Sequence, residues 1–207
     1  MRLPTRSLPL IAALCVILTG STAIATEAGA APVPGSERVL RLPAPKPLRD
    51  VALIDQRGKP FQLSSLRGQT VLVFFGFTHC PDVCPTTLHI LRLLTRSAGE
   101  DLRRVRVVMI SVDPERDTPQ ALKAMLEPLS RDFVGVTGSA RALRAAAEQF
   151  SAVFFKGEVD RATGSYSVDH SSQVYLVDAQ GRLRAVFYNA PVPAMAQEIR
   201  RMQRPAS

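Results

Sequence analysis

Two cysteines separated by three residues are the part of this sequence best suited to chemistry. Cys80 and Cys84 lie within "FFGFTHCPDVCPTTLHI", residues 74–90, and the chain of 207 residues has only three cysteines. In a helical first turn, residues i and i+4 lie on the same face, so both sulfurs can converge on one point. Backbone N–H groups and the helix dipole at that end favour the thiolate of Cys84, the form that attacks disulfides and binds soft metals.

Three kinds of site fit such a pair. A structural disulfide across so short a loop would stabilise the fold only weakly, because it removes little chain entropy. A redox pair of the thioredoxin type normally has two intervening residues, whereas Cys80 and Cys84 have three. A metal clamp made of two thiolates selects soft ions, Cu(I) above all, and a third ligand would complete it. The spacing alone leaves the redox and the metal interpretations open.

His170 is the candidate for the third ligand. It lies near the end of the polar segment "GEVDRATGSYSVDHSS", residues 157–172. An imidazole there would complete a set of two sulfurs and one nitrogen, which suits Cu(I) and, with an added oxygen ligand, Cu(II). The segment is predicted to be a loop or an irregular hairpin, whereas the cysteines lie on regular structure, so we expect His170 to be the ligand that moves during metal transfer. We expect His79 to point away from the site and His89 to lie far round the helix from Cys84.

A strand and a helix are needed to hold these side chains. Residues 70–77, "TVLVFFGF", form a continuous apolar run typical of a central strand covered on both faces. A helix is predicted from about residue 85 to residue 98, since Leu88, Leu91 and Leu94 recur on one stripe. The cysteines therefore lie at the carboxyl end of a strand and the start of a helix. Asp82 or Cys84 itself would be the N-cap.

The rest of the chain alternates between strands and helices. Strands are predicted as a short hairpin within 50–63, then at 104–112, 133–138 and 152–156, and as a second hairpin at 173–188. Helices are predicted from Thr118 to about residue 129, at 140–150 after Ser139, and from about residue 193 to 202. This order predicts an α/β, thioredoxin-like fold: a central mixed β-sheet flanked by helices, with an N-terminal β-hairpin and an inserted helix-strand element. Asp113, Arg116 and Asp117 are expected to form an ion-paired turn.

The N-terminal region is predicted to be a targeting segment followed by a linker. Two arginines precede an apolar stretch, residues 8–25, which ends in an A-x-A motif typical of a cleaved signal peptide. An uncleaved membrane anchor is the alternative. Cys15 lies inside the apolar stretch and is interpreted as a filler there. Residues 26–48 are rich in Ala, Pro and Gly and are interpreted as a linker, so the folded domain is expected to be 49–207.

The charge pattern excludes some classes of partner. The chain carries a formal charge of +8, which becomes +6 without the two arginines of the leader. Its arginines are scattered and not interleaved with aromatic residues, so no nucleic-acid partner is expected. A basic exported domain remains suited to an anionic membrane or an acidic partner.

Three motifs occur in order along the domain and together carry a family resemblance. They are "GFTHCPDVCP" at residues 76–85, "SVDPERDTP" at 111–119 and "YSVDHSSQVYLVD" at 166–178. Together they resemble the Sco/SenC family, and the similarity spans roughly residues 45–204. Members of that family are exported or membrane-tethered thioredoxin-like copper proteins. They help to build the binuclear copper site of cytochrome c oxidase subunit II.

The resemblance implies a ligand set and a function. Cys80 and Cys84 would be the thiolate ligands of one copper ion, Cu(I) or Cu(II), and His170 the imidazole ligand. The protein would be a monomeric metallochaperone, more a carrier than an enzyme, that delivers copper to subunit II of the oxidase or another acceptor. It would work in the periplasm or on the outer face of the inner membrane, where the N-terminal segment can associate with the membrane.

Two alternatives stay open. In the first, Cys80 and Cys84 are the redox pair of a thiol-disulfide oxidoreductase, cycle through a Cys80–Cys84 disulfide and reduce the acceptor's cysteines. In the second, the protein is a redox or copper sensor. A peroxiredoxin is disfavoured, because the Thr expected three residues before the reactive cysteine is Pro81 here.

Overall fold

The structure, a computed structural model, describes residues 38–96 and 99–204 of the chain. They belong to one compact unit, which spans residues 32–207. The predicted leader, residues 1–25 with Cys15, lies outside the described residues, as do residues 26–37 of the predicted linker. None of the helices in the described ranges is long and apolar enough to cross a membrane.

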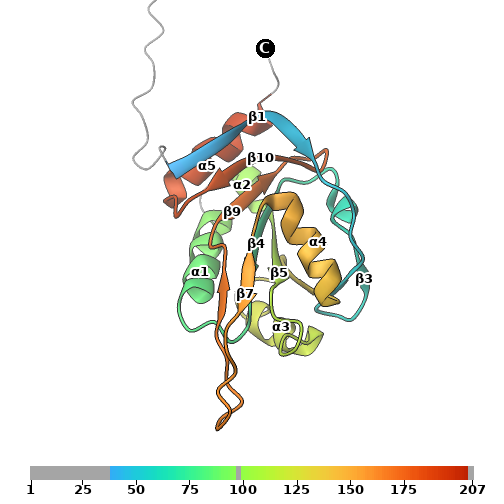
Figure 1. Ribbon diagram of the computed structural model, residues 1–207. Coiled ribbons are helices and arrows are strands. Elements are labelled where there is room, and N and C mark those ends of the chain that lie inside the picture. Colours follow the sequence, from blue (N-terminus) through green and yellow to red (C-terminus); the bar gives the residue numbers. More distant parts are fainter. Residues whose placement is uncertain (1–37, 97–98, 205–207) are drawn as a thin grey trace, which may run out of the picture. The chain divides into compact units, whose positions relative to one another are not determined.

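A mixed sheet of eight strands forms the centre of this unit (Figure 1). The strand order is β1-β10-β9-β4-β5-β6-β2-β3, and a separate pair, β7 with β8, completes the strands. The bounds are β1 Val39–Pro47, β2 Leu53–Asp55, β3 Pro60–Phe61, β4 Val71–Gly76, β5 Arg106–Ser111, β6 Phe133–Thr137, β7 Phe154–Lys156, β8 Val168–His170, β9 Val174–Val177 and β10 Arg182–Phe187. Strands β4, β5 and β6 are parallel, whereas β9 pairs with β4 in the antiparallel sense.

Helices cover both faces of the sheet. They are α1 Val83–Arg96, α2 Glu100–Arg103, α3 Pro119–Leu126, α4 Ala140–Phe150 and α5 Val192–Gln203, with a 3-10 turn η2 at Leu63–Leu66. Side chains of α2, α3 and α5 and the leucines of α1 belong to one buried cluster, whereas those of α4, with Cys84 from the start of α1, belong to the cluster on the other face. The central strand β4 is buried at all six positions and contributes to both clusters. The predicted thioredoxin-like fold is therefore confirmed.

Local signals in the sequence place most element boundaries. The Thr118 side chain accepts a hydrogen bond from the backbone N–H of Ala121, and Ser139 does the same for Ala142. Both are therefore N-caps, as predicted. Helix α1 begins at Val83, two residues earlier than expected, so Asp82 takes the N-cap place.

One expectation about the chain outside the core is wrong, and one alternative is decided. Residues 39–47 of the predicted linker form strand β1, which pairs antiparallel with β10 at the edge of the sheet. Prolines are tolerated on an edge strand because their missing N–H faces away from the ladder. The polar segment at 157–172, predicted to be a loop or an irregular hairpin, is the hairpin: its strand β8 pairs antiparallel with β7 and so fixes His170 opposite Phe154.

Candidate metal centre

The two cysteines lie where the buried strand β4 passes into helix α1. After Gly76 the chain makes a turn, in which the N–H of Cys80 donates to the carbonyl of Phe77 at 3.3 Å. Helix α1 then begins, with the N–H of Thr86 donating to the carbonyl of Asp82 at 3.2 Å. Cys80 is therefore half-buried in the connecting loop, and Cys84 is buried in the first helical turn.

Glycine at position 76 is what lets Cys84 approach the strand. A Cβ built on Gly76 would lie only 2.9 Å from the Cys84 Sγ and 3.0 Å from the Phe74 ring. Real Cβ atoms do not approach so closely, so any side chain here would push the sulfur out of place. The last residue of β4 thus sets the depth of the buried sulfur.

The end of helix α1 acts directly on Cys80. The backbone N–H of Cys84 donates to the Cys80 Sγ at 3.4 Å, so that sulfur occupies the place of a capping group. The first turn of α1 therefore contacts the sulfur of Cys80, whereas the sequence argument had placed that contact at Cys84.

Cys84 itself behaves differently from the prediction. Burial raises the pKa of the Cys84 thiol well above its ordinary value, and the neighbouring Cys80 and Asp117 add to the effect. The backbone of Phe77 opposes this increase but does not overcome it. The empty protein therefore carries a protonated thiol at Cys84, and a metal ion must displace that proton to bind.

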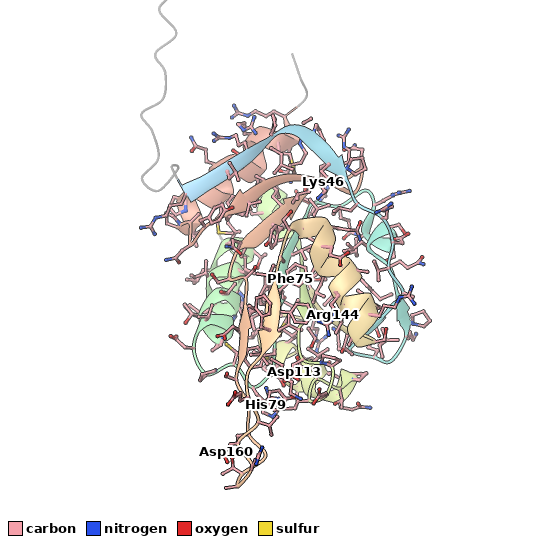
Figure 2. The ribbon with its side chains drawn as sticks, in the orientation of Figure 1. Lys46, Phe75, His79, Asp113, Arg144 and Asp160 are labelled. Atoms are coloured by element: carbon pink, nitrogen blue, oxygen red, sulfur yellow. The ribbon has the colours of Figure 1, made fainter. Side chains whose placement is uncertain are left out.

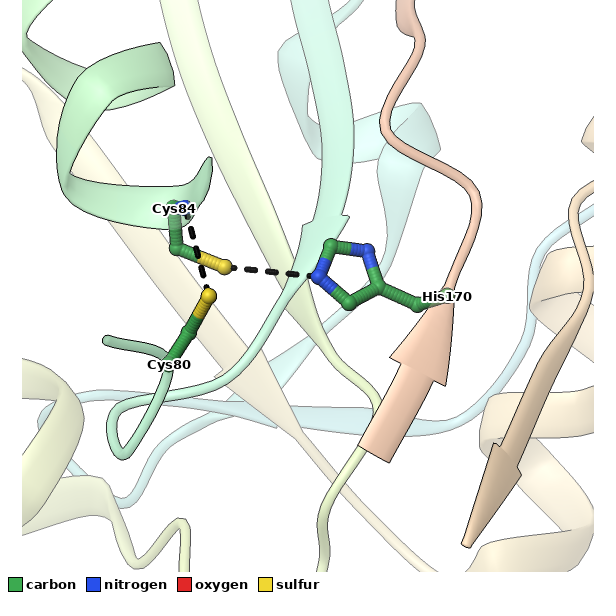
Figure 3. A group of neighbouring side chains, drawn as sticks. All are labelled: Cys80, Cys84 and His170. Atoms are coloured by element: carbon green, nitrogen blue, oxygen red, sulfur yellow. Dashed lines mark hydrogen bonds between the residues drawn. The ribbon is translucent and has the colours of Figure 1, made fainter. Parts of the chain in front are cut away.

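His170 presents one ring nitrogen to the sulfurs. Its Nδ1 lies 3.0 Å from the carbonyl oxygen of Ser171, which can only accept, so Nδ1 carries the proton. The lone pair is then on Nε2, which faces the Cys84 Sγ at 3.5 Å (Figure 3). The Phe77 ring meets the imidazole edge-on, with the ring centroids 5.7 Å apart. The imidazole is thus oriented from two sides, and it is held more firmly than expected for a loop ligand.

Cys80, Cys84 and His170 converge on one point. Their candidate ligand atoms all lie within 4.8 Å of one another. No second group of His, Cys, Asp or Glu side chains in residues 38–96 and 99–204 meets the same criterion. Two sulfurs and one imidazole nitrogen form a soft donor set, which fits Cu(I) and Zn(II) far better than Mg²⁺ or Ca²⁺. The two thiols are free in the structure, so the set is ready for a metal.

The other candidates from the sequence lie outside this group. The His79 Nδ1 is 3.0 Å from the Thr78 hydroxyl, and the ring is exposed. His89 is exposed on α1. The Asp82 carboxylate is exposed and accepts a long hydrogen bond, 3.5 Å, from the Thr86 hydroxyl.

A buried carboxylate that the sequence reasoning misjudged holds the cysteine loop. Asp117 accepts hydrogen bonds from the N–H of Thr78 at 3.0 Å, the Thr78 hydroxyl at 2.6 Å and the Ser111 hydroxyl at 2.7 Å. Burial raises the pKa of Asp117 although these donors oppose it. The predicted ion-paired turn includes Asp113 and Arg116 but not Asp117, which instead fixes the backbone two residues before Cys80.

A second layer behind the imidazole comes from the β7–β8 region. The Tyr166 hydroxyl donates to Asp113 at 2.7 Å, and the Arg116 guanidinium lies 3.7 Å from the Tyr166 ring centroid. Burial and this carboxylate raise the pKa of Tyr166 to about 12, so the hydroxyl stays a donor. Arg116 also lies over the Phe77 ring, 5.8 Å from its centroid, and Phe77 in turn packs on His170. Asp113 and Arg116 belong to the motif "SVDPERDTP", and Tyr166 and His170 belong to "YSVDH". The occurrence of both motifs in one chain was the only sign in the sequence that these residues act together.

Comparison with known protein families decides where the chain belongs. The SCO1/SenC family model matches residues 45–204, which include all three candidate ligands. The chain belongs to the SCO1/SenC family. The match covers the region in which the sequence showed its resemblance, so that prediction is confirmed.

Individual known proteins are similar to about three quarters of this chain. A protein of Stutzerimonas stutzeri described as a putative copper-binding protein is 38% identical over 147 residues, 70% of this chain and 71% of that protein. The structure of Bradyrhizobium japonicum ScoI with copper bound is 35% identical, covers 74% of this chain and 97% of that chain, and has a TM-score of 0.66.

A third protein, of known structure, is also similar to this chain. It is BsSco, described as a member of the Sco family of cytochrome c oxidase assembly proteins with a disulfide switch. It is 29% identical, covers 78% of this chain and 95% of that chain, and has a TM-score of 0.61.

Proposed function

We propose that this SCO1/SenC protein binds one copper ion through Cys80, Cys84 and His170 and delivers it to the binuclear copper site of cytochrome c oxidase subunit II. The observation that carries the proposal is the convergence of two sulfurs and one imidazole within 4.8 Å. Copper bound to ScoI and the copper-binding description of the Stutzerimonas relative support the choice of ion. The description of BsSco supports the acceptor.

The geometry suits release of the ion as well as binding. Cys80 and His170 are half-buried, whereas Cys84 is buried, so an incoming ligand reaches the copper from the side of Cys80 and His170. Ligands of the acceptor then replace those of this protein one at a time, and the bond between copper and Cys84 is expected to break last. The proton that Cys84 held in the empty state returns to it as the copper leaves. Its high pKa makes that step favourable.

The experiment that tests copper binding is a comparison of two histidine variants. His170→Ala removes a ligand, and we expect Cu(I) affinity to fall at least tenfold, which corresponds to about 1.4 kcal/mol. His89→Ala is the matched control, because His89 is exposed on α1, and wild-type affinity is expected. Affinities are measured on reduced protein against a chromophoric chelator, and X-ray absorption counts sulfur and nitrogen neighbours. Equal affinities for wild type and His170→Ala would exclude His170 as a ligand.

Thiol-disulfide exchange is a second candidate, favoured by the half-buried sulfur of Cys80 beside a buried partner. The Cys80 thiolate would attack an acceptor disulfide, Cys84 would release the mixed disulfide, and the acceptor would gain two electrons and two protons as the Cys80–Cys84 disulfide forms. The disulfide switch of BsSco supports this reaction. Reduction of the acceptor that survives in His170→Ala but is lost in Cys84→Ser would establish it. Loss of activity in both variants would tie the reaction to copper.

We further propose that the protein acts as a monomer after export, in the periplasm or on the outer face of the inner membrane. The leader-like pattern of residues 1–25 supports export. Oxidation of Cys80 and Cys84 would remove both thiolate ligands, so copper loading would depend on the redox poise of that compartment.

A further inference from the structure

An exposed basic surface lies on strand β1 and helix α5, remote from the copper ligands in the sequence. It carries six exposed cations, namely Arg38, Arg41, Lys46, Arg200, Arg201 and Arg204. Residues 38–47 and 192–204 contain a single acid, Glu198, and only 1% of its side chain is exposed. We call this surface the β1–α5 face. The charge that the β1–α5 face exposes to solvent is therefore almost entirely positive.

Glu198 positions the guanidinium groups of two arginines but does not neutralise the positive charge of this face. It accepts from Arg41 at 2.7 Å and from Arg201 at 2.6 and 3.0 Å. Arg41 remains 47% exposed and Arg201 52% exposed, so each keeps N–H donors free for the solvent side. Asp101 pairs with Arg200 at 2.9 Å. Six cations against Glu198 and Asp101 leave a local charge of +4.

Apolar side chains border these cations. Leu40 is 54% exposed and Tyr188 is 45% exposed. Successive side chains of a strand point to opposite faces, so Arg41 points toward α5 and Leu40 away from it. The edge strand β1 therefore presents Arg41 on one side and Leu40 on the other. Guanidinium forks match phosphate oxygens, while Leu and Tyr side chains suit the boundary between headgroups and acyl chains.

The β1–α5 face lies at the end of the domain that the N-terminal segment joins. Lys46 is at one end of the molecule, whereas His79 and Asp160 mark the end that carries the metal centre (Figure 2). Twelve residues, 26–37, separate the predicted leader from Arg38, and they span at most about 40 Å when extended. A leader at the membrane would therefore keep this face closest to the bilayer and raise its effective concentration there.

We propose that the β1–α5 face docks on the anionic phospholipid headgroups of a membrane. Five of the six cations are arginines, which suits bidentate contacts with phosphate, and the bordering Leu40 and Tyr188 suit an interface better than a soluble acidic partner. Docked in this way, the domain turns the Cys80–Cys84–His170 centre toward the aqueous side, where a copper acceptor can reach it. The inference does not depend on copper binding.

The test uses residues 32–207, so that the leader cannot bind lipid by itself. These residues form one compact unit, and the solved chain of ScoI consists almost entirely of the matched domain. We expect the protein to sediment with vesicles containing about 30 mol% phosphatidylglycerol in about 0.1 M salt, and not with pure phosphatidylcholine vesicles. Salt at about 0.5 M should release it, because it screens the headgroup charge.

The decisive variant removes cations outside the Glu198 network, of which Arg38 donates to the carbonyl of Asn189 at 3.1 Å. Arg38, Lys46 and Arg204 form no ion pair among the residues that the structure describes, so the triple change to Gln leaves the Glu198 network intact. Each cation near an anionic surface contributes a factor of about five, so partitioning should fall on the order of a hundredfold.

A matched control removes the same charge elsewhere. Arg57, Lys59 and Arg131 are exposed near the β2–β3 edge, which lies opposite β1 in the strand order. We expect their triple change to Gln to leave partitioning within about threefold of wild type, since these cations are remote from the headgroups.

Three results would overturn the proposal. Equal loss in both triple variants would mean that only net charge matters. If the wild-type protein does not bind phosphatidylglycerol vesicles, the β1–α5 face would be assigned to an acidic protein partner instead of a membrane. Equal binding to phosphatidylcholine would show that the headgroup charge is not recognised. Copper affinity, measured on the same samples, should not change in either variant, so failure here is distinguishable from failure of the copper site.

Discussion

The position of a single proton on His170 decides which side of its ring can take a metal ion. Because the carbonyl of Ser171 accepts from Nδ1, the other nitrogen keeps its lone pair and faces Cys84. Metal-binding histidines are commonly fixed in this way by a partner on the far nitrogen. At Cys84, burial sets a high pKa that only a bound metal offsets. The empty centre is thus geometrically prepared but still protonated at one sulfur.

Removal of the Asp117 carboxylate should affect both the stability of the fold and the copper affinity. Asp117→Ala leaves three donors on Thr78 and Ser111 without their acceptor, so we expect the free energy of unfolding to fall by about 2 kcal/mol or more. We also expect Cu(I) affinity to fall about tenfold, because Thr78 lies two residues before Cys80. Urea titration and chelator competition measure the two effects.

The control for Asp117 is Asp132→Ala. Asp132 is 61% exposed and pairs with Arg106 at the surface, so its loss should cost less than about 1 kcal/mol and leave copper affinity unchanged. If Asp117→Ala lowers stability but not copper affinity, the Cys80 loop is positioned by the Cys84 N–H and not by Asp117.

The candidate ligands could be predicted from residue types, but the residues that support them could not. Two sulfurs four residues apart at a strand-helix junction restrict the geometry strongly, and the family resemblance supplied His170. The role of Asp117 depends on the approach of β5 to β4, which places Ser111 opposite Gly76. Spacing along one segment carries no information on such a neighbour. The pKa of Cys84 was misjudged for the same reason, since burial is a property of the packed molecule.

At the scale of elements, strand β1 shows how a local signal can mislead. The segment Val39–Pro47, "VLRLPAPKP", has three prolines in nine residues, and this composition favoured a linker. As an edge strand, β1 needs ladder bonds on one side only, and its register with β10 shifts between Arg41 and Lys46, across the first two prolines. The salt bridge from Arg41 to Glu198 then attaches the strand to α5. Strands in the sheet interior were predicted correctly because continuous apolar runs leave little choice.

Glu198→Gln tests how β1 is attached. Burial alone would raise the pKa of Glu198, but the guanidinium groups of Arg201 and Arg41 outweigh it and hold the pKa below the usual 4.5. The stabilisation is therefore complete above the unfolded pKa and is lost as pH falls through the folded pKa. At pH 7 we expect the variant to be less stable by about 1–3 kcal/mol.

The pH dependence of the unfolding free energy shows whether Glu198→Gln acts through the lost charge or through altered packing. As pH falls below about 4.5, wild type loses the same charge that Gln lacks, so the difference in unfolding free energy should shrink. Glu127→Gln, which changes an exposed residue 4.0 Å from Lys123, should differ from wild type by less than about 0.5 kcal/mol throughout. A difference for Glu198→Gln that stays constant as pH falls from 7 to well below 4.5 would show that packing, and not charge, attaches β1.

At the scale of the whole molecule, copper would join parts of the chain that are distant in sequence. Cys80 and Cys84 belong to the β4–α1 junction, whereas His170 ends β8, 86 residues beyond Cys84. The fold brings them together because β9, the strand after His170, pairs antiparallel with β4, the strand before the cysteines. This pairing follows from the thioredoxin-like order, so the site was predictable once the fold was. The tilt and burial of the three side chains were not.

Because the unfolded chain cannot hold these three ligands together, copper should stabilise the folded protein by mass action. At a free Cu(I) concentration of about 100 times Kd, the gain is about 2.7 kcal/mol. For a domain of this size that raises Tm by roughly 5–10 °C. Calorimetry on reduced wild type and on His89→Ala should show the same increase, and His170→Ala should show much less. Protein with an oxidised Cys80–Cys84 pair should show none, since both thiolates are consumed. An equal increase in the oxidised protein would contradict binding through the two thiolates and would mean that copper binds at a site of another kind, since residues 38–96 and 99–204 hold no second group of three such ligands.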